Sequence, residues 1–207
     1  MIKLIIFDFD GVLIDSIKNM EFAWKNTCNN CRIKVPFYKY KKFIGLPFYK
    51  ILSNLKIKKK KFQSISKNYN HYSTKKNKLV KFKKKNIKFL KILKKKGYVL
   101  GLFTSKNRKR SNLILGKNKK LFKYKVFPSK KLKGKPYPDG LNKILNMGSF
   151  KKEEAIYLGD TKYDYLSAKK AKIKYIHANW GYQKIKNKKV EKINKKSHLR
   201  GYLNSEK

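Results

Sequence analysis

Short apolar runs alternate with longer stretches of helical spacing over most of the chain. The first run, residues 1–6, is rich in isoleucine and typical of a buried strand in a parallel sheet. Further apolar runs predict four more strands: residues 98–103, 124–127, 155–158 and 173–178. Between these runs, apolar positions recur at the spacing of amphipathic helices. Because strand–helix alternation produces crossovers between parallel strands, the pattern predicts an α/β fold.

The stretch that follows the first strand has a different pattern. Its apolar positions, among them Ile17, Met20 and Trp24, recur at helical spacing, and no convincing strand is visible in it. Ser16 stands just before this periodicity and is a plausible N-cap. We therefore expect a helical insertion after the first strand of the sheet.

These patterns suggest two units. We expect an α/β core formed by residues 1–15 and 80–207, and a small helical domain formed by residues 16–79. Within the core, Asp139 follows a proline and is expected to cap a helix. The lysine-rich tail from about Ile185 is expected to form a terminal helix.

The net charge of +46 is extreme and permits two interpretations. One is a polyanion-binding surface, and the other is a bias in composition toward lysine. Only four of the 57 basic residues are arginine, the residue best suited to bidentate phosphate and base recognition. The lysines are also spread over almost the whole chain. We therefore expect no specific nucleic-acid partner, although non-specific binding through charge is possible.

The apolar runs and the cysteines bear on the compartment of the protein. No apolar run reaches the roughly 18 residues of a membrane span, and the opening run is too short for a secretory signal. Cys28 and Cys31 form a lone CxxC without a second ligand pair, so two reduced thiols are expected. These features favour a cytoplasmic protein without membrane association. For its assembly, we expect either a monomer or a homodimer.

The candidate chemistry begins at the end of the first strand. Asp8 and Asp10 are spaced i, i+2, which places both carboxylates on the same side of the chain, and Gly11 follows them. Buried like charges require a compensating cation or proton. The sequence therefore indicates a metal site, a phosphate site, or both.

Other polar residues follow the later predicted strands. Thr104 follows the second strand and Asp160 the fourth, while Lys135 lies in a loop near the same sheet edge. Ligands of open parallel sheets bind at the carboxyl ends of the strands. A nucleophile, a proton donor, a metal site and donors to phosphoryl oxygens are the groups that phosphoryl transfer requires.

Four segments carry a family resemblance: FDFDGVLIDS, LFTSKN, GKPYPDG and GDTKYD. In this order they resemble the four motifs of the haloacid dehalogenase-like (HAD) phosphatases, in particular the branch that contains phosphoglycolate phosphatases. The resemblance extends over about residues 1–182. It implies a Rossmann-like parallel-sheet core with a small helical cap, inserted after the first strand, that closes over the site.

The resemblance also implies roles for single residues. Asp8 would be the nucleophile that forms an aspartyl-phosphate, and Asp10 the acid that protonates the leaving oxygen and then activates water. Thr104 would donate a hydrogen bond to the phosphoryl group. Lys135 would neutralise the phosphoryl charge and that of Asp8.

The resemblance further implies a magnesium site, which oxygen ligands suit. The ion would be held by the Asp8 carboxylate, the backbone carbonyl of Asp10 and the Asp160 carboxylate. Asp164 would support the ion directly or through water.

The motifs also narrow the activity within the superfamily. Dehalogenases lack the second aspartate of the first motif, which is present here as Asp10. Sugar-phosphate mutases usually carry a glutamate before the aspartate of the fourth motif. This chain has Gly159 before Asp160, which favours a hydrolase over a mutase. We expect a magnesium-dependent phosphatase acting on a small phosphorylated metabolite, such as phosphoglycolate or a sugar or nucleotide phosphate. The alternatives are a phosphosugar mutase, a pyrophosphatase, or a non-catalytic HAD-fold module that binds polyanions.

Overall fold

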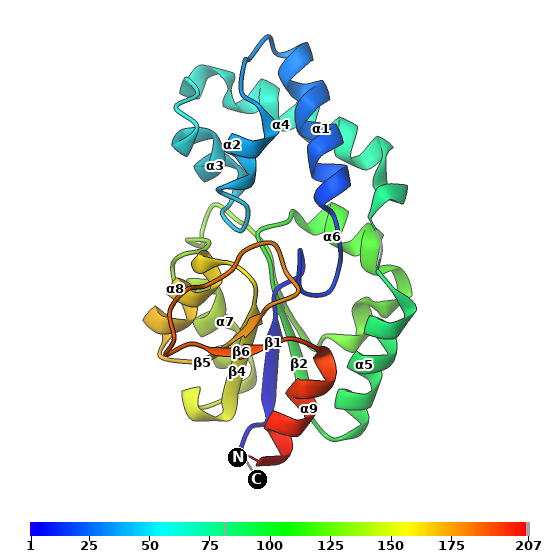
Figure 1. Ribbon diagram of the computed structural model, residues 1–207, viewed down its shortest axis with the longest axis vertical. Coiled ribbons are helices and arrows are strands. Elements are labelled where there is room, and N and C mark those ends of the chain that lie inside the picture. The colour runs from blue at the N-terminus through cyan, green and yellow to red at the C-terminus, as the bar shows by residue number, and fades with distance from the viewer. Residues whose placement is uncertain (81, 206–207) are drawn as a thin grey trace.

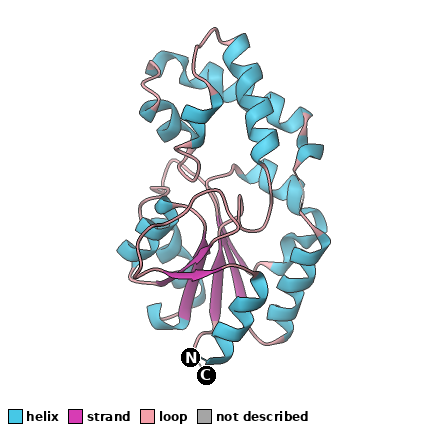
Figure 2. Ribbon diagram, in the orientation of Figure 1, coloured by secondary structure: helices cyan, strands magenta, loops and turns pink. Residues whose placement is uncertain are grey.

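A parallel sheet of six strands forms the lower part of the described chain in the computed structural model (Figures 1 and 2). The structure describes residues 1–80 and 82–205. Residues 206–207, the end of the predicted core range, and Lys81 lie outside the described residues. The strand order is β3-β2-β1-β4-β5-β6. The strands are β1 (Leu4–Phe7), β2 (Val99–Phe103), β3 (Tyr124–Val126), β4 (Ala155–Gly159), β5 (Lys174–Ala178) and β6 (Glu191–Ile193).

Helices cover both faces of this sheet. Side chains alternate across a strand, so Ile5 and Phe7 of β1 pack with α5 and α9, whereas Leu4 and Ile6 pack with α7 and α8. All four side chains are fully buried, which explains the continuous apolar run. The helices around the sheet are α5 (Lys84–Lys95), α6 (Arg108–Leu115), α7 (Asp139–Gly148), α8 (Lys162–Ala171) and α9 (Lys196–Ser205), with 3₁₀ turns η3 (Gly116–Leu121) and η4 (Lys152–Glu154). The predicted α/β class and parallel sheet are confirmed.

A second layer, here called the helical unit, occupies residues 17–79 and lies above the carboxyl ends of the strands (Figure 1). It has its own apolar core, centred on Trp24, Leu52 and Ile65. The Trp24 indole donates a hydrogen bond to the Val35 carbonyl over 2.8 Å. Its elements are α1 (Ile17–Asn30), α2 (Phe37–Lys41), α3 (Phe48–Asn54), η1 (Lys59–Lys61), α4 (Phe62–Lys75) and η2 (Asn77–Leu79). That this unit acts as a cap stays a prediction.

One local expectation was incomplete and another was wrong. The tail forms a sixth strand before its helix, with Ile193 paired to Ala178 of β5. Three residues surrounded by lysines carry no readable alternation, so tertiary pairing alone defines β6. Asp139 is the first residue of α7 rather than its cap, since Pro138 takes the N-cap position and its carbonyl accepts from Asn142.

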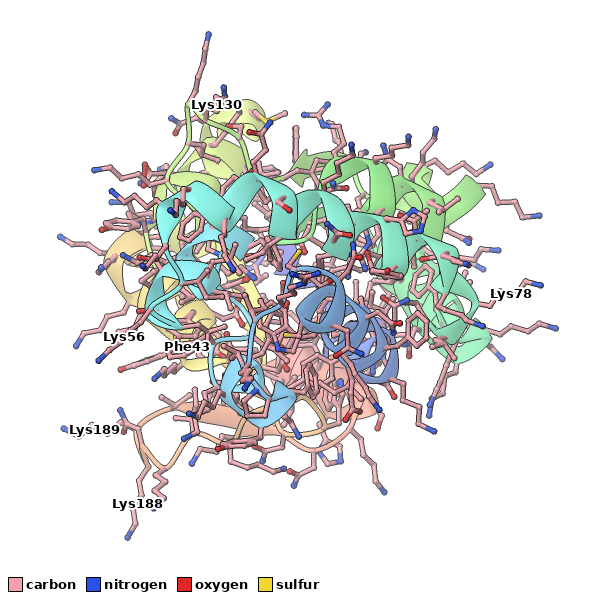
Figure 3. All side chains as sticks on the ribbon, turned by 90° about the horizontal axis from the view of Figure 1, so that it is seen from above. Phe43, Lys56, Lys78, Lys130, Lys188 and Lys189 are labelled. Atoms are coloured by element: carbon pink, nitrogen blue, oxygen red, sulfur yellow. The ribbon has the colours of Figure 1, made fainter. Side chains whose placement is uncertain are left out.

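The lysines project from many sides of the molecule. Figure 3 labels five exposed examples, of which only Lys188 and Lys189 share a turn: Lys56, Lys78, Lys130, Lys188 and Lys189. This arrangement fits a bias in composition better than one built polyanion surface. No helix among the described residues is long and apolar enough to cross a membrane.

Candidate active site

The predicted site residues meet at the carboxyl edge of the sheet. Asp8 follows β1, Thr104 follows β2 and Asp160 follows β4, so the parallel register brings these three buried residues together. Lys135 reaches the same place from the loop between β3 and α7. A cavity of about 410 Å³ lies between this edge and the helical unit. Its lining includes Asp8, Asp10, Thr104 and Lys135 from below and Tyr40, Gly45 and Tyr69 from above.

Lys135 is the electrostatic centre of the site. Its side chain is fully buried, and its Nζ lies 2.5 Å from Asp8 Oδ1 and 2.6 Å from Asp164 Oδ1. Burial alone would lower the pKa of Lys135, but the carboxylates of Asp164 and Asp8 outweigh it and raise that pKa. Lys135 therefore stays charged and holds two carboxylates that would otherwise repel each other.

The carboxylates respond differently to this environment. Burial raises the pKa of Asp8 to about 7, against the opposing effect of Lys135. Burial, together with the charge of Asp8, also raises the pKa of Asp160 well above its usual range. For Asp164, burial is outweighed by Lys135 and by hydrogen bonds from Thr161 and Tyr157, so its pKa is lowered.

The three buried aspartates fit a divalent cation. Asp8, Asp160 and Asp164 offer carboxylate oxygens within 4.8 Å of one another. Oδ1 of Asp160 is buried without a hydrogen-bond partner, while its Oδ2 accepts from the Tyr182 amide over 2.6 Å. Buried polar atoms are nearly always satisfied, so this orphan oxygen indicates a missing ligand, and a cluster of carboxylate oxygens suits magnesium.

Asp164 is more fully engaged than the other two aspartates. Its Oδ1 accepts from Lys135 and Tyr157, and its Oδ2 accepts from the amide and hydroxyl of Thr161. The bond from the Thr161 amide, together with the bond that the Asp164 amide donates to the Thr161 hydroxyl oxygen over 3.3 Å, forms a capping box at the start of α8. The bonds to the Asp164 carboxylate suit indirect support of an ion through water, although direct ligation by Asp164 stays a prediction. The carboxylate of Asp10 lies outside the cluster, in keeping with the predicted use of its backbone carbonyl.

Two glycines make room for Asp160. A Cβ on Gly11, whose φ is +85°, would lie 2.1 Å from Asp160 Oδ2. A Cβ on Gly181 would lie 2.1 Å from the Asp160 Cβ. Any side chain at either position would displace the carboxylate, so the backbone on both sides can approach Asp160 only through glycine.

Asp10 is held by a second set of contacts. Its Oδ1 accepts a hydrogen bond from the Ser16 hydroxyl and lies 3.0 Å from Lys106 Nζ. Ser16 is the N-cap residue of α1, as expected, but its side chain makes no capping hydrogen bond. Its amide instead donates to the Tyr182 hydroxyl over 2.7 Å. The Ser16 carbonyl accepts the first helical hydrogen bond, from the Met20 amide over 2.9 Å, while the Ser16 hydroxyl orients Asp10.

Sequence reasoning assigns no role at this site to Lys106, Arg110 or Tyr182. Lys106 is buried, and burial lowers its pKa to about 8 although Asp10 opposes the shift. In a chain this rich in lysine, Lys106 gives no signal of its own. Arg110 is one of only four arginines, and that scarcity could have drawn attention to it. Tyr182 lies in the Trp-Gly-Tyr segment, which by itself indicates little.

The helical unit is joined to this edge by direct contacts. The Ser105 hydroxyl donates to the Gly45 carbonyl over 2.6 Å, and the Gln183 amide donates to the Ile44 carbonyl over 3.3 Å. The turn at residues 45–47 thus lies on the cavity wall. Both layers contribute to the site in this conformation.

Magnesium should stabilise the protein more at about pH 7.5 than at about pH 5.5, because ligands must be deprotonated to bind a cation. With a pKa of about 7, Asp8 is largely protonated at the lower pH. Without metal, the folded chain keeps this proton while the unfolded chain has lost it, so the Asp8 contribution to stability falls as the pH rises from about 4 to about 7. Thermal melts with and without magnesium at both pH values check this.

The same melts are carried out on the Asp160→Asn variant, which lacks the charge of one predicted ligand. It should reduce the magnesium effect at the higher pH. An equal magnesium effect at both pH values would contradict the expected coupling.

Comparison with known proteins shows which family the chain resembles. The sequence profile of the haloacid dehalogenase-like hydrolases matches residues 5–178. Pyrophosphatase PpaX of Bacillus cereus is 28% identical over 189 residues, covering 86% of this chain and 84% of that protein. The corresponding protein of Bacillus mycoides is 26% identical over the same length.

Solved structures show the same fold. A haloacid dehalogenase-like family hydrolase from Streptococcus pneumoniae superposes with a TM-score of 0.83 at 23% identity, covering 98% of both chains. A protein described as a predicted phosphoglycolate phosphatase from Haemophilus somnus gives 0.83 at 17% identity, also over 98% of both chains. With the profile match over most of its length, the chain belongs to the haloacid dehalogenase-like hydrolase family.

Proposed function

We propose that this protein is a magnesium-dependent phosphatase that hydrolyses a small phosphomonoester through an aspartyl-phosphate on Asp8. One observation carries the proposal. The buried carboxylate of Asp8 lies at the cavity floor, 2.5 Å from Lys135 and within the cluster that fits a cation, and Asp10 lines the same cavity. This arrangement supplies a nucleophile, charge neutralisation and a separate proton-transfer group.

The first step would be attack of an Asp8 carboxylate oxygen on phosphorus. A new bond forms between that oxygen and phosphorus, and the ester P–O bond breaks. Asp10 gives its proton to the leaving oxygen, so the alcohol departs neutral. Ser16 and Lys106 both contact Asp10 Oδ1, which leaves the other carboxylate oxygen to carry this proton.

The second step would hydrolyse the aspartyl-phosphate. Asp10, now ionised, takes a proton from water as the water oxygen attacks phosphorus, and the bond between phosphorus and Asp8 breaks. Inorganic phosphate leaves, and both aspartates return to their starting states. A group that first acts as acid and then as base therefore completes the cycle without another proton donor.

Two further residues would bind the phosphoryl oxygens. The Thr104 hydroxyl oxygen accepts from the Lys106 amide over 3.0 Å, so its own proton is free to be donated to the substrate. Lys135 would stabilise negative charge on the phosphoryl group. A magnesium ion held by Asp8, Asp160 and the Asp10 carbonyl, with support from Asp164, would add further neutralisation of that charge.

The cavity and the comparisons bear on the substrate. A cavity of about 410 Å³, partly covered by the helical unit, suits a small metabolite better than a polymer. The names of the PpaX relatives favour pyrophosphate as a second candidate substrate. Gly159 before Asp160 favours hydrolysis over mutase chemistry, and the complete set of site residues argues against a non-catalytic module. We further propose a cytoplasmic enzyme without a specific nucleic-acid partner.

Release of p-nitrophenol from p-nitrophenyl phosphate tests the proposal. Turnover should require magnesium, disappear with a chelator and return when magnesium is added in excess. A panel of phosphorylated metabolites and pyrophosphate should then identify a preferred substrate. If no phosphate ester or anhydride is hydrolysed while nucleic acid is bound with site preference at physiological salt, the phosphatase proposal fails.

A further inference from the structure

The cavity contains a buried cation that the proposed chemistry does not use. Arg110 of α6 lines the cavity together with Asp8 and Asp10, and only 6% of its surface is exposed. Its Nε is buried and has no hydrogen-bond partner. Within the described part of the chain, no carboxylate forms an ion pair with its guanidinium. A buried charge is normally paired, so this one is an exception that needs an explanation.

The other cations of the inner cavity are already compensated. Lys135 is paired with Asp8 and Asp164, and Lys106 with Asp10. Lys106 and Arg110 are four positions apart in the sequence and line the same cavity. Among the described residues, Asp10 is paired with Lys106 and no carboxylate is paired with Arg110, which leaves an excess positive charge on this side of the cavity.

The surroundings of Arg110 form a defined pocket wall between the two layers. Its Nη2 donates to Asn19 Oδ1 over 3.1 Å, and Asn19 is itself fixed by bonds to the carbonyls of Ser73 and Lys76. The guanidinium carbon lies 5.7 Å from the centre of the Tyr69 ring. These contacts orient the guanidinium but supply no negative charge.

Hydroxyl groups complete this part of the cavity. The hydroxyls of Tyr40 and Tyr69 lie 3.2 Å apart, and both tyrosines are buried and line the same cavity. Both tyrosines belong to the helical unit, whereas Arg110 and Lys106 belong to the α/β core. An anion bound here would therefore contact both layers. The planar fork of an arginine suits a carboxylate or a phosphate, which it can bind through two parallel hydrogen bonds.

We propose that Arg110, together with Lys106 and the hydroxyls of Tyr40 and Tyr69, binds a second anionic group carried by the substrate, separate from the phosphoryl group that is transferred. The proposal rests on the proposed phosphatase function and narrows it. The substrate class is then a small phosphate ester or anhydride with an additional carboxylate or phosphate in its leaving group. Arg110 determines specificity and takes no part in bond breaking.

A purely structural role for Arg110 makes different predictions. If Arg110 only holds α6 against α1, its loss would weaken the contact between the two layers and would change kcat/KM by the same factor for every substrate. As an anion site, it distinguishes substrates by charge. The ratio of kcat/KM values for a charged substrate and its neutral analogue therefore separates the two roles.

The test compares 2-phosphoglycolate with its carboxyl methyl ester, which keeps the phosphoryl group and removes the second charge. Wild type should prefer the charged compound by about 30-fold, the range of a charge-assisted hydrogen bond. Arg110→Gln should abolish this preference, and Arg110→Lys should keep part of it. Lys109→Gln is the matched control, because Lys109 is exposed on the same helix and should leave the ratio unchanged. Hydrolysis of pyrophosphate by the same variants tests a substrate whose second anionic group is a phosphate.

The outcomes are separable from those of the phosphatase proposal. An unchanged ratio in Arg110→Gln, or a wild type without preference for charge, overturns the anion site even if the enzyme is active. If wild type hydrolyses neither compound, calorimetric titration with 2-phosphoglycolate tests whether Arg110 contributes to binding of the anion. Binding lost in Arg110→Gln but kept in Lys109→Gln supports the anion site, and equal binding by all three proteins overturns it.

Discussion

The Asp8→Asn variant should release phosphate from p-nitrophenyl phosphate roughly 10⁴-fold or more slowly than wild type, as expected when a covalent nucleophile is removed. Asparagine has almost the same shape as aspartate, and its oxygen can still accept from Lys135 over the present 2.5 Å contact. Its amide, however, cannot supply the ionised oxygen that attacks phosphorus. Initial-rate measurements with saturating magnesium give the size of the loss.

The fold of this variant should be retained. Burial disfavours the charged form of Asp8 and raises its pKa to about 7, so removing the charge does not leave an unfavourable group behind. Circular dichroism melts without metal should show a melting temperature no lower than that of wild type. Asp15→Asn is the matched control, since Asp15 is exposed and close in sequence. Residual turnover of Asp8→Asn near wild-type level would exclude Asp8 as the nucleophile.

The Lys135→Met variant should lose both activity and stability. Methionine fills similar space but leaves Asp8 and Asp164 buried without their shared cation. Removing one partner of a buried ion pair typically costs about 3–5 kcal/mol. We expect a loss of that order in the free energy of unfolding, measured by urea denaturation near neutral pH.

Protonation should limit the damage in this variant. Without Lys135 the remaining carboxylates can become neutral at low pH, so the stability difference from wild type should shrink as the pH falls below about 7. The control is Lys131→Met, an exposed lysine in the same loop. A change below about 1 kcal/mol in Lys135→Met, as for an exposed ion pair, would contradict the central role of Lys135.

The features that could be predicted from the sequence are those determined by residues close together along the chain. The alternation of apolar runs and helical spacing predicts the first five strands of the sheet and their parallel direction. Asp8, Thr104 and Asp160 could be placed together because each directly follows a buried strand, and the register then brings strand ends to one edge. That Lys135 belongs to this group came from its motif, since the loop length alone does not determine where the side chain goes.

The unpredicted part depends on contacts between distant segments. Ser16 resembles a helix cap in sequence, yet its hydroxyl is used by Asp10 and its amide by Tyr182, 166 positions away. The environment of Arg110 is made by α1 and α4, whose arrangement above the sheet no periodicity describes. Strand β6 is similarly defined by its pairing with β5 rather than by its own residues.

The exposed lysines on many sides of the molecule have a consequence for encounter kinetics. Positive charge on many sides of the molecule attracts small anions and raises their local concentration, an effect that salt screens over about 10 Å at 0.1 M. Such attraction carries no direction, because Lys56, Lys78 and Lys188 lie in separate regions (Figure 3). Collision rates should thus depend on ionic strength, whereas the choice among the anions that arrive is left to the few buried groups in the cavity.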